Sequence, residues 1–109
     1  MKTRIIVNLT IEGTHWWPDC DIREVLYLRN EHRHQFAICA KKEVGHEDRD
    51  IEIICFKREI AEYLHRRFGE PCNFGTLSCE TIARILAEEF SLEYCSVLED
   101  GENGAEITE

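Results

Sequence analysis

The 109-residue chain lacks several features that would assign it to a membrane, secreted or repetitive class. It has no apolar run long enough to cross a membrane, no internal repeat, no linker and no low-complexity stretch. Its start, MKTRIIVNLTIEG, has no small-residue cleavage site and does not resemble a signal peptide. These absences predict one soluble domain over residues 1–109, with a tail that frays from about residue 103.

The chain also lacks an excess of positive charge. Its formal net charge is −9, and its 13 lysines and arginines are scattered from Lys2 to Arg84. A surface of this kind repels the phosphate backbone of nucleic acids, because the positive charges form no patch. We therefore expect neither a nucleic acid nor a membrane among its partners.

The sequence contains no CxxC pair, which argues against a zinc finger and against a thioredoxin-like site. Six cysteines are nevertheless present. Cys39, Cys55 and Cys95 lie in apolar, strand-like runs, where a free cysteine behaves as a small hydrophobic residue. A secreted disulfide framework is the alternative, but this pattern favours free thiols and a cytoplasmic location.

Hydrophobic periodicity predicts an α+β fold. Apolar runs and period-two alternation predict strands over residues 4–15, 25–41, 51–56, 93–98 and 105–108, the second of them with a break near Asn30 as an alternative. Helical spacing predicts helices over residues 57–68 and 79–90, with Ser78 as the N-cap of the second. We expect an antiparallel sheet of four to five strands with both helices on one face.

Three of the five histidines fall on the same predicted sheet face. His15 ends the first strand facing inward, and His32 and His34 project from one face of the second. An isolated H-x-H pair is common on surface strands, so His15 strengthens the case for a metal. Three histidines with an open fourth position form the catalytic type of zinc site. Other divalent metals also accept nitrogen ligands.

Five short motifs follow one another along almost the whole chain. They read EGTH, HRHQF, IEIICFKREIAEYL, LSCETIA and SVLEDG. In this order they resemble the 6-pyruvoyl-tetrahydropterin synthases and their bacterial relatives, the 6-carboxy-tetrahydropterin synthases of the queuosine pathway. The family pattern has a strand that ends in histidine, a histidine pair, a segment that heads the second helix and a late strand that closes with glutamate.

The resemblance implies a tunnel-fold subunit of the order β-β-α-α-β-β, which assembles into a homo-oligomeric ring such as a hexamer. It implies that His15, His32 and His34 bind Zn²⁺ and that Glu99 anchors a pterin or purine-like substrate. A carboxylate suits this role because it accepts two hydrogen bonds from an amidine-like N–H edge. The implied activity is that of a zinc-dependent lyase acting on dihydroneopterin triphosphate or a related pterin.

The sequence departs from the family pattern at the catalytic acid–base groups. The family cysteine just before the histidine pair has no counterpart in VLYLRNE, and the Leu-Asp-His segment before the second helix is absent from RRFGEPCNFGTL. Cys20 and Cys72 are the candidates to replace these groups. Acidic residues lie near both, whereas a reactive thiolate needs electropositive surroundings.

Two alternatives to the lyase stay open. The first is a catalytically degenerate module that binds a pterin or purine. The second is a tunnel-fold enzyme with different chemistry on a 7-deazaguanine base. Trp16 and Trp17 follow the first candidate ligand, where an indole ring stacks on a heterocycle or packs at a rim.

Overall fold

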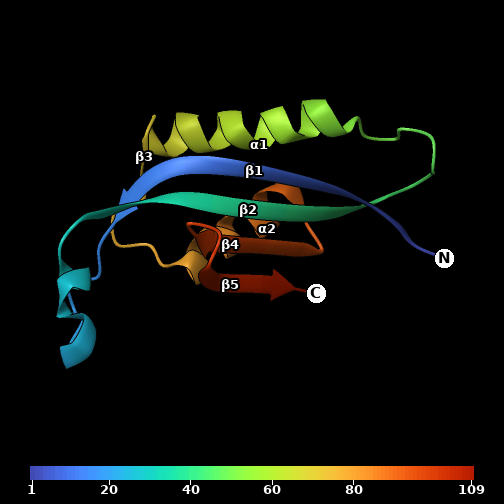
Figure 1. The fold of residues 1–109 in the computed structure, drawn as a ribbon. Coiled ribbons are helices and arrows are strands. Elements are labelled where there is room, and N and C mark those ends of the chain that lie inside the picture. The colour runs from blue at the N-terminus through green and yellow to red at the C-terminus, as the bar shows by residue number, and fades with distance from the viewer.

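The computed structural model describes residues 1–109, which form an α+β fold around one mixed sheet (Figure 1). In chain order the elements are β1 (Thr3–His15), the 3-10 helix η1 (Arg23–Arg29), β2 (His32–Val44), α1 (Ile53–Phe68), β3 (Cys72–Asn73), α2 (Cys79–Phe90), β4 (Tyr94–Glu99) and β5 (Asn103–Thr108). The strands are ordered β3-β1-β2-β4-β5. Only the short β1–β3 pair is parallel. None of the helices is long and apolar enough to cross a membrane.

A long hairpin of β1 and β2 forms the centre of the sheet. Its register runs from Thr3 opposite Val44 to His15 opposite His32. The period-two pattern of β1 is confirmed, since alternate residues from Val7 onward are buried. Both α1 and α2 contribute to the single core of 18 residues that covers this face, as the sequence predicts. Figure 1 shows α1 lying along β1.

The predicted strand over residues 51–56 is wrong, because α1 begins at Ile53. The carboxylate of Glu52 caps the helix, accepting hydrogen bonds from the backbone N–H groups of Ile54 and Cys55, each at 3.0 Å. A short apolar run cannot be assigned to a strand or a helix by periodicity alone. The cap therefore decides the outcome, and it leaves Cys55 exposed rather than inside a sheet.

The second strand begins at His32 and ends at Val44, instead of covering residues 25–41. Residues 23–29 form η1, which buries none of its residues and projects beyond the end of the hairpin (Figure 1). The backbone N–H of Trp17 donates to the carbonyl of Leu28 at 2.7 Å and closes the base of this projection. The pairing of β1 ends at His15, so the apolar residues before His32 have no neighbouring strand.

The strand predicted over residues 105–108 is confirmed as the end of β5 (Asn103–Thr108), which pairs with the whole length of β4, so the tail does not fray from about residue 103. The connecting turn contains Asp100 and Gly101, with φ values of 57° and 73°. Asp-Gly is a favoured pair for a hairpin turn with positive φ. This turn therefore holds the end of the chain in the sheet.

Candidate metal centre and its cleft

Four side chains converge at one end of the sheet. His15 lies opposite His32 in the hairpin, and His34 lies opposite Gly13. Glu99, the last residue of β4, joins the three histidines, and one ligand atom from each of the four residues lies within 4.8 Å of the others. The three histidines of the predicted site are thus brought together, and a fourth donor is added, Glu99, which the family resemblance assigns to substrate. The group could hold a metal ion.

The outer nitrogen of each imidazole ring is held by a hydrogen-bond acceptor. His15 Nδ1 donates to the carbonyl of Leu77 at 2.9 Å, and His32 Nδ1 donates to the carbonyl of Asn30 at 2.8 Å. A carbonyl oxygen only accepts, so each Nδ1 carries a proton, and in the neutral ring the lone pair of Nε2 is then available to a metal. His34 is held in the same way by a carboxylate, described below. Metal-binding histidines usually have this second hydrogen bond.

The inner nitrogens of His15 and His34 are buried and make no hydrogen bond. Glu99 Oε2 nevertheless lies 2.7 Å from His15 Nε2 and 3.4 Å from His34 Nε2. A carboxylate oxygen and unprotonated nitrogens repel one another unless a cation or a proton lies between them. A proton joins only two atoms, whereas a metal ion uses all four donors. Donor atoms around a tetrahedral zinc lie roughly 3.3 Å apart. The 3.4 Å from Glu99 Oε2 to His34 Nε2 is close to this spacing, whereas the 2.7 Å to His15 Nε2 is the distance of a hydrogen bond or ion pair.

Asp100 fixes the third histidine. Its Oδ2 accepts from His34 Nδ1 at 2.7 Å, and its Oδ1 accepts from the backbone N–H of Gln35 at 2.9 Å. The hydrogen bond from the Gln35 N–H lowers the pKa of the Asp100 carboxyl most, and the hydrogen bond from His34 lowers it further, so the carboxyl stays ionised. The sequence shows Asp100 only as a turn residue, so its role as a support for His34 was missed.

An aromatic floor supports the ligand rings from the core side. Phe36 is fully buried, and its ring centroid lies 5.2 Å from that of His15 and 5.6 Å from that of His34, both edge to face. Phe74 packs against Phe36 at 5.0 Å. A Cβ atom at Gly13 would lie 2.7 Å from the Phe74 ring, so only glycine permits this close packing. The floor limits the rotation of the His15 and His34 rings.

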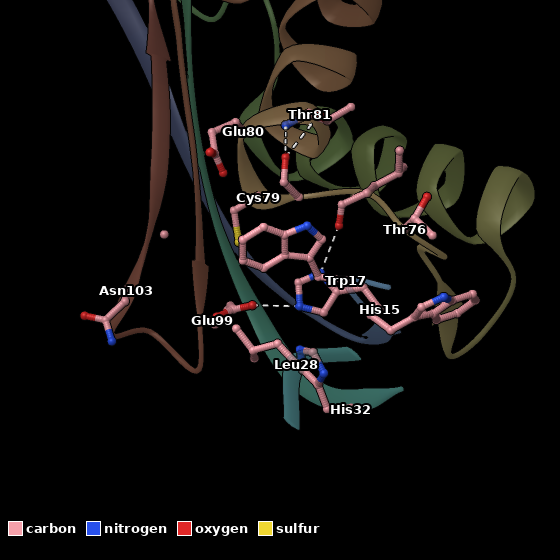
Figure 2. A pocket seen from close by; sticks show the side chains of 14 residues that line it. His15, Trp17, Leu28, His32, Thr76, Cys79, Glu80, Thr81, Glu99 and Asn103 are labelled. Atoms are coloured by element: carbon pink, nitrogen blue, oxygen red, sulfur yellow. Dashed lines mark hydrogen bonds and ion pairs between the residues drawn. The ribbon is translucent and has the colours of Figure 1, made fainter. Parts of the chain in front are cut away.

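A cleft of about 470 Å³ opens beside the cluster. Figure 2 shows the contact between His15 and Glu99 among the side chains that line it. The remaining walls come from the Trp16–Trp17 segment, Leu28, the first turn of α2 and the start of β5. The cluster is therefore reachable by a small molecule.

The two cysteines proposed as catalytic are placed away from the cleft. Cys20 and Cys72 are 0% and 1% exposed, and neither lines the cleft. Burial raises the pKa of the Cys72 thiol to about 11. Cys79 at the start of α2 does line the cleft, and no sequence pattern had singled it out. Burial is the main cause that raises the pKa of the Cys79 thiol to about 12, and the charges of Glu99 and Glu80 add to it.

No protein-family model and no curated protein matches this chain. Among solved structures, the crystal structure of the uncharacterized protein WS1659 from Wolinella succinogenes is similar to it, with a TM-score of 0.62. The match covers 99% of this chain and 98% of that chain at 12% sequence identity. The similarity therefore concerns the fold alone.

Proposed function

We propose that this protein is a zinc-dependent lyase of the 6-pyruvoyl- or 6-carboxy-tetrahydropterin synthase type, acting on dihydroneopterin triphosphate or a related pterin. One observation carries the proposal. The free Nε2 atoms of three histidines converge beside an open cleft, and those histidines occur in the order of the family motifs.

Zinc is the metal that best suits this donor set. His15, His32 and His34 offer three nitrogens, and Glu99 offers one oxygen, all within 4.8 Å of one another. A bound zinc supplies a Lewis acid that polarises the hydroxyl and carbonyl oxygens of a substrate side chain.

Glu99 has one of two roles in this proposal. It is either the fourth donor of the cluster, 2.7 Å from His15 Nε2, or it leaves that position open and binds substrate in the cleft that it lines. A carboxylate at the border between a metal and a cleft accepts hydrogen bonds from the N–H edge of a pterin. Replacing Glu99 by glutamine separates the roles, because loss of substrate binding with zinc retained would assign Glu99 to the substrate.

A pterin- or purine-binding module is the second candidate, and the composition of the cleft favours it. Apart from His15 and His32, the titratable groups that line the cleft are Cys79, Glu80 and Glu99. None of them belongs to the acid–base set of the family. If these groups move no proton, the protein holds its ligand without converting it.

We also propose a homo-oligomeric ring in the cytoplasm. The outer edge of β5 has no further strand beside it, so its backbone groups are available for a neighbouring subunit. All six cysteines are free, which suits a reducing compartment. Native mass spectrometry would measure the subunit number, and a monomer at micromolar concentration would contradict the ring.

Metal analysis and turnover test the proposed activity. We expect one zinc per chain, with both the metal and the turnover of dihydroneopterin triphosphate or its relatives lost in His32→Ala. His46→Ala is the matched control, because His46 is exposed in the loop after β2 and lies outside the cluster. A zinc-loaded protein that retains a pterin without converting it would instead support the binding module.

A further inference from the structure

A second hollow lies on the sheet face that points away from the core. Its volume is about 270 Å³, and residues of β1, β2 and β4 form most of its lining. Cys95 and Val97 are both fully buried in the core, so Ser96 between them faces the other side of the sheet. The hollow shares no lining residue with the cleft at the histidine cluster, so the two are separate.

The hollow is lined by one positive charge and several hydrogen-bond donors. Lys57 reaches it from α1, which lies along β1 (Figure 1). The ion pairs of lysine and arginine in this protein all involve other residues, so the Lys57 ammonium group has no carboxylate partner. The other lining side chains that can donate are Asn8, Thr10, Cys39 and Ser96. No aspartate or glutamate lines the hollow, although the formal net charge of the chain is −9.

The hydroxyl group of Ser96 points to a bound molecule. Ser96 is only 7% exposed. The hydroxyl groups that form hydrogen bonds within the protein are those of Tyr63, Ser78, Thr81 and Tyr94, so the Ser96 hydroxyl has no partner. A buried hydroxyl without a hydrogen bond costs free energy, and a ligand atom in the hollow would remove this cost.

Tyr94 holds the neighbouring charges of this sheet face outside the hollow. Glu106 lies opposite Ser96 in the β4–β5 pair, and its Oε1 accepts from the Tyr94 hydroxyl at 3.4 Å. Lys41 Nζ lies 4.3 Å from the centroid of the Tyr94 ring. Neither Glu106 nor Lys41 lines the hollow, so Lys57 is its one charged lining residue.

From these features we infer that the hollow binds the carboxylate group of a small organic acid. One ammonium group matches the single charge of a carboxylate, whose two oxygens accept hydrogen bonds from Lys57 and from the Ser96 hydroxyl. Ala37 and Leu98 offer an apolar surface to the rest of the ligand. A phosphate monoester carries about two negative charges and would meet one compensating charge. The inference goes beyond the proposed function, because it requires no metal.

Titration with butanoate, followed through NMR shifts of the backbone amides, tests the inference. We expect the amides of Asn8, Cys39 and Ser96 to shift, and we expect butanoate to bind at least about tenfold more tightly than the neutral butanamide. Equal binding of the two probes would overturn the inference. So would shifts confined to the histidine cluster, where a carboxylate can bind a metal, or the absence of any shift. Inorganic phosphate is titrated in parallel, and tighter binding of phosphate would contradict the choice of a carboxylate.

Substitutions in the hollow separate ligand binding from folding. Lys57→Gln should weaken butanoate binding by about tenfold or more, because it removes the charge. Arg58→Gln is the matched control, because Arg58 is exposed at the next position of α1 but lies outside the hollow. Ser96→Ala should weaken binding by about threefold or more and leave the melting temperature at or above that of the wild type, since it removes an unpaired hydroxyl rather than a hydrogen bond. Equal effects of Lys57→Gln and Arg58→Gln, or unchanged binding in Ser96→Ala, would show that the hollow does not hold the carboxylate.

Discussion

The carboxylate of Asp100 lies 2.7 Å from Nδ1 of His34, and the turn conformation of Asp100, with a φ of 57°, places it there. The residue that begins the β4–β5 hairpin turn therefore also orients a candidate metal ligand. The turn and the candidate metal centre form one structural unit.

Removal of this carboxylate should weaken the metal centre. We expect Asp100→Ala to lower zinc affinity by about 10- to 100-fold, because His34 loses the acceptor that fixes its orientation and tautomer. Asp100→Asn should lose less, since the amide oxygen still accepts a hydrogen bond. Competition with a chelator measures the affinities. Glu102→Gln in the same turn is the control, and an equal loss in that variant would contradict a specific role for Asp100.

The aromatic floor should affect zinc affinity as well as stability. Phe36 is fully buried against His15 and His34, so Phe36→Ala should lower the free energy of unfolding by about 3–5 kcal/mol. Phe36→Leu should cost less, usually under about 1.5 kcal/mol, but it should still loosen both rings and weaken zinc binding.

Urea unfolding of the metal-free protein and zinc competition measure the two effects of the Phe36 variants separately. Ile38→Val is the control from the same strand and the same core, with an expected cost of about 0.5–1.5 kcal/mol. Its zinc affinity should stay at the wild-type value. If the Phe36 and Ile38 variants lose zinc affinity only in proportion to their loss of stability, the aromatic floor has no specific effect on the histidines.

The cap of α1 should make stability depend on pH. The backbone N–H groups of Ile54 and Cys55 lower the pKa of Glu52 from its model-compound value of 4.5. A carboxyl with a lowered folded pKa stabilises the protein above its unfolded pKa, and this contribution is lost as pH falls through the folded value. Glu52→Gln should therefore melt at a lower temperature than wild type at pH 7. The difference should shrink on acidification below about pH 4.5.

Thermal melting followed by circular dichroism between pH 2 and pH 7 would measure this convergence. Glu59→Gln is the control, because Glu59 is exposed on α1 but does not cap it. A melting difference for Glu52→Gln that is constant over the whole range would show that the charge of Glu52 does not stabilise the cap.

The order in which the cysteines react with an alkylating reagent should follow the exposure of their side chains. Cys55 is the exposed cysteine, so an alkylating reagent should modify it first in the native protein. Its reaction should be slow near neutral pH, because the hydrogen bond and the charge of Glu52 raise the pKa of its thiol. Cys72 and Cys95 should stay unmodified until the protein unfolds, since burial raises their pKa values to about 11 and about 12. Peptide mass spectrometry over time identifies the order, and early labelling of Cys72 would contradict the placement of β3.

The sequence by itself determined the parts of the fold that depend on local periodicity. The alternation in β1 put His15 on the buried face, and the spacing in HRH put His32 and His34 on one face of β2. The cluster was predicted on the condition that the two strands pair as an antiparallel hairpin, and the register that places His15 opposite His32 meets this condition. Ser78 marked the start of α2 because its hydroxyl satisfies a free backbone N–H of the first turn, that of Thr81.

Only the tertiary structure decided which other groups reach the cluster. Glu99, Asp100, Cys79 and the carbonyl of Leu77 lie between 62 and 85 residues along the chain from His15, and packing alone brings them near it. Period-two patterning could not separate the strand expected at residues 51–56 from a helix, and the helix that forms there is capped by two hydrogen bonds to the Glu52 carboxylate. Local patterns set which face a side chain occupies, whereas the register and the turns between elements set which side chains share a site.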